Sequence, residues 1–158
     1  MQEAVLYSFR RCPYAMRARW ALINYNIKVL VREVELKNKP SELLKISKKA
    51  TVPVLITSRS TVIEESIDIM KWAINQNNYK NSKKANRYFL SKEETLLIEE
   101  NDNLFKFHLD RYKYPNRYLN NDINQSRFVL KSIILKWSNL ISESSRNDSS
   151  GWLIGEKE

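Results

Sequence analysis

A single cysteine, Cys12, lies in the basic segment RRCPYAMRAR near the start of the chain. Cations near a thiol favour the thiolate, which is the nucleophilic form of cysteine. Because the 158 residues contain one cysteine and one histidine, both an internal disulfide and a zinc site built from Cys and His are excluded. Any redox chemistry of Cys12 must therefore use a thiol or disulfide from a partner. Four arginines surround it: Arg10, Arg11, Arg17 and Arg19.

The pattern around Cys12 predicts a strand followed by a helix. The segment EAVLYSF is a short apolar run typical of a strand, whereas in CPYAMRARWALINYN the apolar residues Met16, Trp20 and Ile23 recur at helical spacing. Pro13 suits a first helical turn, where its missing N–H would have no partner. Cys12 is thus expected at a helix N-terminus, whose dipole and free N–H groups stabilise a thiolate. The alternative is a buried, inert cysteine.

A mixed α/β pattern continues to residue 77. The segments KVLVREVEL, VPVLIT and STVIE read as strands, and KPSELLKIS and ESIDIMKWAINQ read as helices. The resulting order is βαβαββα. We therefore predict a thioredoxin-like domain over residues 1–77, a small mixed sheet with helices on both faces.

The strand signal disappears beyond a polar, basic stretch, residues 78–90, which we assign as a linker. Residues 91–158 are predicted to form an all-helical domain. Two pairs have the spacing of a helix capping box: Ser91 with Glu94, and Asp122 with Gln125. The helices expected over 91–113 and 122–144 have more apolar surface than one two-helix contact covers. We expect this domain to be incomplete: the chain is a truncated product, which we favour, or another subunit covers these faces.

Composition and charge limit the classes of protein to which the chain can belong. No apolar run approaches the roughly 20 residues of a membrane span, and the start of the chain lacks a secretory signal, so we expect a cytoplasmic protein. The net charge is +9, and residues 1–77 hold 13 Lys and Arg against 7 Asp and Glu. A basic surface can bind nucleic acid, and HLDRYKYPNRY places aromatics among basic residues. Since Pro115 interrupts that segment, we expect its aromatics to pack a helix corner, and we expect no nucleic-acid partner.

Four motifs together resemble the N-terminal domain of the glutathione S-transferase superfamily. They are CPYAMRAR, LKNKP, TVPVL and IEES, in register between residues 12 and 66. Within the superfamily, the cysteine-containing omega-like and glutaredoxin-2-like branches are the most similar. The helical second region resembles the C-terminal domain of the family more loosely.

The resemblance implies that Cys12 attacks a glutathione mixed disulfide and that a second glutathione regenerates it. CPYA lacks the second cysteine of a C-x-x-C motif, so the mechanism would be monothiol. Transferases with a tyrosine or serine in this place conjugate electrophiles, whereas a cysteine favours thiol transfer, deglutathionylation or dehydroascorbate-type reduction. Glutathione would be the cosubstrate and a disulfide or an electrophilic small molecule the other substrate, with no metal. A homodimer is also implied, as is common among relatives.

The resemblance also implies a set of binding residues. A cis bond between Val52 and Pro53 would present the Val52 backbone to a peptide ligand; the alternative is an ordinary trans turn proline. Glu65 and Ser66 lie at a strand-to-helix junction, where free N–H groups and the Ser66 hydroxyl would hold a carboxylate, although Ser66 could simply cap its helix. Lys39 would pair with another carboxylate unless it is an ordinary surface lysine. Candidates for lining the site are Phe9, Pro13, Tyr14, Arg17, His108 and Tyr112.

A different class of function stays open. Some proteins of this fold, such as the stringent starvation proteins that bind RNA polymerase, are interaction modules without a catalytic role. They lack the cysteine-proline start, so CPYA, VP and ES together favour an enzyme here. His108 could act as a general base, but a helix histidine without a visible partner is more often structural.

Overall fold

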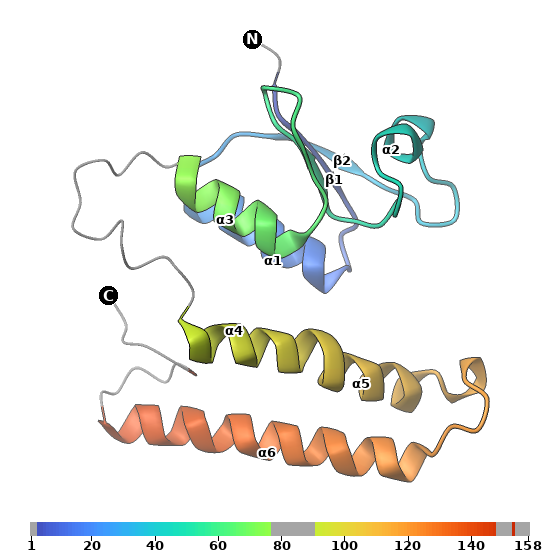
Figure 1. Cartoon of the computed structure of the whole chain (residues 1–158), viewed down its shortest axis with the longest axis vertical. Helices are drawn as coiled ribbons and strands as arrows, with labels where there is room; N and C mark the ends of the chain where they lie inside the picture. Colours follow the sequence, from blue (N-terminus) through green and yellow to red (C-terminus); the bar gives the residue numbers. More distant parts are fainter. Residues whose placement is uncertain (1–2, 77–90, 148–152, 154–158) are drawn as a thin grey trace. The chain divides into compact units, whose positions relative to one another are not determined.

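The computed structural model describes residues 3–76, 91–147 and 153 of the chain (Figure 1). These residues belong to two compact units, residues 1–88 and residues 89–158, and we describe each unit by itself. The predicted linker, residues 78–90, lies outside the described residues. Among the helices that the structure describes, none is both long and apolar enough to cross a membrane.

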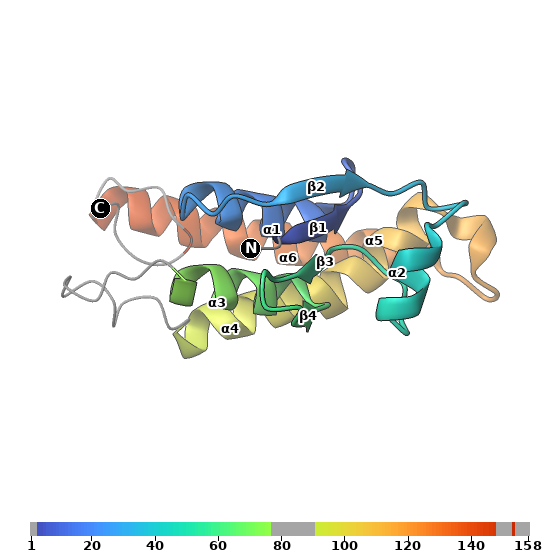
Figure 2. The same cartoon turned by 90° about the horizontal axis from the view of Figure 1, so that it is seen from above.

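The first unit is a four-stranded mixed sheet with helices on both faces, in the predicted order βαβαββα. Its elements are β1 (Val5–Ser8), α1 (Pro13–Asn24), β2 (Leu30–Glu33), α2 (Ser41–Ile46), β3 (Val54–Ile56), β4 (Val62–Ile63) and α3 (Ser66–Gln76). The strand order is β2-β1-β3-β4, in which β1 pairs with β2 in parallel and with β3 antiparallel (Figure 2). The predicted thioredoxin-like fold is confirmed.

The two faces of the sheet bury alternate residues of the central strands, as the period of a strand requires. On one face Leu6 and Leu55 pack against the helix pair α1 and α3. On the opposite face Tyr7 and Val54 pack with Leu43 of α2. The centre of the sheet is thereby fixed from both sides. The end of β1, from which the chain enters α1 through Cys12, is thus anchored in the core.

Small residues bring α1 close to its neighbours. Ala15, Ala18 and Ala21 are fully buried, whereas the larger Trp20 and Ile23 are 62% and 78% exposed. An alanine stripe of this kind lets one helix backbone approach another closely. The close approach of α1 and α3 matters for the site because Cys12 precedes α1 and Ser66 begins α3.

The second unit is helical, as predicted. It contains α4 (Lys92–Glu99), a π-helical segment (Glu100–Phe105), α5 (Lys106–Lys113), a 3-10 turn (Pro115–Arg117) and α6 (Ile123–Asn147). The capping box at Ser91 and Glu94 is present in full. The other predicted cap is also seen, because the Asp122 carboxylate accepts a hydrogen bond from the Gln125 N–H at 2.9 Å.

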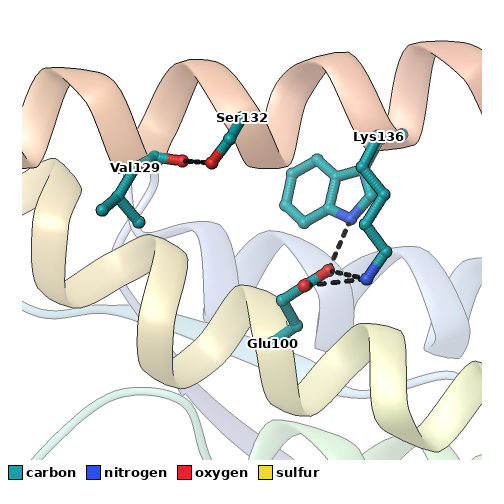
Figure 3. A network of polar contacts seen from close by, with 5 residues as sticks. Glu100, Val129, Ser132 and Lys136 are labelled. Atoms are coloured by element: carbon teal, nitrogen blue, oxygen red, sulfur yellow. Dashed lines mark hydrogen bonds and ion pairs between the residues drawn. The ribbon is translucent and has the colours of Figure 1, made fainter.

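A polar network ties the π-helical segment to α6. Glu100 accepts hydrogen bonds from Lys136 at 2.8 Å and from the Trp137 indole at 3.0 Å, and Figure 3 shows the carboxylate reaching toward α6. The Phe105 and Trp137 rings lie 5.0 Å apart. Both ends of the segment therefore contact α6 at Trp137.

Candidate functional site

Cys12 is the N-cap residue of α1, and its side chain makes no capping hydrogen bond to the first turn. Its backbone is extended, Pro13 opens the helix, and the Cys12 carbonyl accepts the first helical bond from Met16 at 2.9 Å. The side chain is half-buried and not in a disulfide. The N-terminus of α1, where free N–H groups favour an anion, therefore begins directly after Cys12.

The thiol of Cys12 meets the segment that leads into β3. It donates to the Val52 carbonyl, with 3.6 Å between sulfur and oxygen. The Val52–Pro53 bond is cis, which confirms the geometry that the resemblance implies. Forty residues apart in sequence, Cys12 and Val52 are thus neighbours, and a peptide that used the Val52 backbone would lie beside the thiol.

A second contact joins α1 to the start of α3. The Arg17 guanidinium donates to the Ser66 hydroxyl at 2.8 Å and 3.3 Å, and it also lies over the Tyr14 ring at 5.4 Å. Ser66 is 4% exposed. Free N–H groups at a helix N-terminus, a hydroxyl and a guanidinium form a set of donors that suits a carboxylate.

Glu65 has a partner that sequence reasoning missed. Lys49 forms an ion pair with the Glu65 carboxylate at 2.5 Å, and the hydrogen bond and charge of Glu65 raise the pKa of Lys49. The preceding carboxylate, Glu64, accepts from the Ser47 hydroxyl at 2.5 Å. The loop after α2 therefore contacts both carboxylates before α3. No sequence motif marks this long-range pairing.

Arg19 was also missed as a site residue, although it was noted among the arginines near Cys12. Its guanidinium donates to the Ser8 hydroxyl and to the carbonyls of Phe9 and Arg10. These acceptors belong to the end of β1 and to the turn that joins β1 to α1. Arg19 therefore contacts the segment that holds Cys12.

The remaining candidates divide between the two units. Phe9, Pro13 and Tyr14 flank Cys12 along the chain, as expected from sequence. Lys39 is half-buried and makes no hydrogen bond or ion pair with the described residues. The roles predicted for these four residues stay predictions.

His108 and Tyr112 lie in the second unit, in α5, so their predicted place beside Cys12 stays a prediction. The His108 Nδ1 atom is 3.2 Å from the buried Ser126 hydroxyl, a contact between α5 and α6. Tyr112 is 46% exposed. Within the part of the chain that the structure describes, no group of three or more His, Cys, Asp or Glu side chains could hold a metal.

Comparison with known proteins gives a family match for the first part of the chain. The model of the family described as the glutathione S-transferase N-terminal domain matches residues 6–82. A search of curated proteins gave no match to the sequence.

Solved structures share the fold at low sequence identity. The omega 3C glutathione transferase of Trametes versicolor is 16% identical, with a TM-score of 0.69 over 89% of this chain and 60% of that one. Yeast Ure2p, solved in complex with glutathione, is 14% identical, with a TM-score of 0.77 over 99% of this chain and 78% of that one. A glutathione S-transferase of Rhodospirillum rubrum is 18% identical, with a TM-score of 0.68 over 98% of this chain and 70% of that one. This chain thus spans 60% of the omega transferase. Residues 6–82, just under half of the chain, are thus similar to the glutathione S-transferase N-terminal domain.

Proposed function

We propose that the chain is a glutathione-dependent thiol transferase with Cys12 as its nucleophile. The observation that supports this most is the position of the Cys12 sulfur, at the N-terminus of α1 and 3.6 Å from the Val52 carbonyl. A helix N-terminus favours the thiolate, and the adjacent backbone can pair with a peptide ligand as a strand does.

The reaction consists of two thiol–disulfide exchanges. The Cys12 thiolate attacks the glutathionyl sulfur of a mixed disulfide, the original S–S bond breaks, and the substrate leaves as a thiolate that takes up a proton. The thiolate of a second glutathione, after losing its proton, then attacks the glutathionyl sulfur on Cys12. Glutathione disulfide leaves and the Cys12 thiolate is restored. The mixed disulfide is reduced, and the electrons come from glutathione.

Glutathione carries two carboxylates with a thiol between them, and the site offers groups for each. The Ser66 hydroxyl, the N-terminus of α3 and Arg17 would hold one carboxylate. Lys39 would hold the other, and the Val52 backbone would pair with the peptide beside Cys12. Glu65, fixed by Lys49, would accept from the ammonium group of the ligand. We expect the chain to act in the cytoplasm, and the second substrate to be a disulfide or an electrophile.

Turnover tests this function. With a glutathionylated peptide and excess glutathione, we expect the chain to release the peptide thiol faster than the uncatalysed exchange. Cys12→Ser should reduce kcat/KM by about a hundredfold or more because the hydroxyl is a far weaker nucleophile. Met16→Ser, on the exposed side of α1, is the matched control and should keep the rate. Release at the uncatalysed rate by the wild-type chain would refute the proposal.

A non-catalytic, glutathione-transferase-like interaction module is the second candidate. It is favoured by the fit to yeast Ure2p, of which one solved structure is described as a nitrogen regulation fragment of a prion protein. Under this alternative the chain would bind glutathione without turning it over. The same turnover assay, combined with a glutathione-binding measurement, separates the two functions.

A further inference from the structure

The guanidinium of Arg19 holds the turn that carries Cys12. One terminal nitrogen donates to the Ser8 hydroxyl at 2.5 Å and to the Phe9 carbonyl at 3.4 Å. The other donates to the Arg10 carbonyl at 3.0 Å. Three consecutive residues, the last of β1 and the first two of the turn, are thus bonded to one side chain.

The helix and the strand make this contact possible. Arg19 lies seven residues after Cys12, about two helical turns, so both are on the same side of α1. Ser8 is the last residue of β1 and is fully buried. A hydrogen bond from a guanidinium to a buried hydroxyl is charge-assisted and stronger than one between neutral groups.

The opposite side of the turn is fixed as well. The Arg10 N–H donates to the Glu33 carboxylate at the end of β2, at 2.7 Å. Within the turn the Cys12 N–H donates to the Phe9 carbonyl at 3.0 Å. The backbone before Cys12 is therefore bonded to α1 through Arg19 and to β2 through Glu33.

We propose that Arg19 is a positioning residue, which acts on Cys12 by holding this turn. The inference rests on the proposed function of Cys12 as a nucleophile. A nucleophile reacts fast only when its attacking atom is held in line with its target, and a small displacement lowers the rate strongly. Arg19 acts through the backbone of the turn, and its role requires the planar fork of the guanidinium as well as a positive charge.

The test separates the effect of the planar Arg19 guanidinium from the effect of its positive charge. Arg19→Lys keeps the charge but cannot bond all three acceptors. Arg11→Lys is the matched control, because Arg11 is exposed, adjoins Cys12 and lies over the Phe9 ring at 5.6 Å. We expect the rate constant for glutathionylation of Cys12 by glutathione disulfide to fall about tenfold in Arg19→Lys. Arg11→Lys should stay within twofold of wild type.

Two further readouts distinguish positioning from a purely structural role. The affinity for S-methylglutathione, which has no reactive thiol, should not change in Arg19→Lys. Guanidinium at tens of millimolar should restore part of the rate to Arg19→Ala, whereas methylammonium at equal ionic strength should not. Equal rates for Arg19→Lys and Arg11→Lys, or equal rescue by both cations, would overturn the inference.

If Arg19→Lys does not fold, Ser8→Ala tests the positioning role of Arg19 instead. This variant removes one of the three acceptors, and we expect it to lower the rate about threefold; a wild-type rate would overturn the inference. If wild-type Cys12 is not glutathionylated, the proposed function fails. The same variants are then compared by alkylation of Cys12 with iodoacetamide, which needs no glutathione site. A slower reaction in Arg19→Lys than in Arg11→Lys would still support positioning, and equal rates would overturn it.

Discussion

At the first turn of α3, the Ser66 hydroxyl accepts hydrogen bonds from the Arg17 guanidinium. Ser66 is almost fully buried, so its hydroxyl is shielded from bulk water and is held by its bond to Arg17. In the proposed complex this hydroxyl donates to a carboxylate of glutathione while it accepts from Arg17. One side chain would then link α1, α3 and the ligand.

Ser66→Ala should weaken the binding of S-methylglutathione about tenfold, or about 1.4 kcal/mol, because a donor to a charged group is lost. Titration calorimetry measures the change. Ser58→Ala, at an exposed position between β3 and β4, is the control and should bind as wild type does. Unchanged affinity in Ser66→Ala would remove Ser66 from the binding site.

The places of Cys12 before α1 and of Ser66 at the start of α3 could be predicted from sequence, whereas their roles in a glutathione site stay predictions. Cys12, Val52 and Ser66 lie in local motifs at element junctions, and such motifs can be read from sequence. The partners Lys49 and Arg19 could not be assigned in this way. Lys49 contacts Glu65 because a loop folds back across 16 residues, and a surface lysine is otherwise common.

At the scale of elements, the contact of Glu100 with α6 stabilises the π-helical segment. The hydrogen bond from Lys136 lowers the pKa of Glu100, with a further contribution from the Trp137 indole. Because this pKa is lower in the folded chain than in the unfolded chain, the stabilisation is complete above the ordinary carboxyl pKa of about 4.3. It is lost as the pH falls from there through the lowered value.

Glu100→Gln should therefore lower the free energy of unfolding by about 1 kcal/mol at neutral pH, since Lys136 is half-exposed and solvent weakens the pair. The difference from wild type should shrink as the pH falls below about 4. Urea unfolding followed by circular dichroism measures both. Glu99→Gln, an exposed neighbour, should show no loss. A loss in Glu100→Gln that stays constant with pH would contradict this explanation.

Helix starts were predicted well because caps are local. Ser91 and Asp122 both accept the expected bonds. The π-helical segment was not predicted, since apolar spacing over 91–113 reads as one continuous helix. Its ends, Glu100 and Phe105, both contact Trp137. Trp137 lies 32 or more residues further along the chain, so a local sequence pattern does not contain this contact.

The buried face of α1 shows a second limit of pattern reading. Met16, Trp20 and Ile23 have the apolar spacing of a helix, yet all three are more than half exposed. The alanines are buried instead, because α1 packs closely on α3 and the sheet. Apolar periodicity identifies a helix, but the size of the available space decides which residues fill it.

At the scale of the whole molecule, the two units differ in what they contribute to the proposed function. The first unit has Cys12 and the groups proposed to hold glutathione. The second unit has His108 and Tyr112, two of the residues predicted to line the site. It also exposes large apolar side chains, among them Phe128 at 73% and Leu119 at 97%.

The positive charge of the chain is concentrated in its first half, around the proposed site for an anionic ligand. Residues 1–77 have 13 basic against 7 acidic side chains, an excess of six, and residues 78–158 have 14 against 11, an excess of three. A field of this sign would attract glutathione and its disulfides, which are anions. Charge and site geometry therefore favour the same class of ligand.

The central claim is that Cys12 reacts as a nucleophile beside a glutathione site. The most direct test is the intact mass of the chain after incubation with glutathione disulfide below about pH 7, where an ordinary cysteine is almost wholly protonated. We predict the rapid gain of one glutathionyl group by the wild-type chain and none by Cys12→Ser. No gain by the wild-type chain, or a gain only at alkaline pH, would contradict the claim and favour a fold reused for binding.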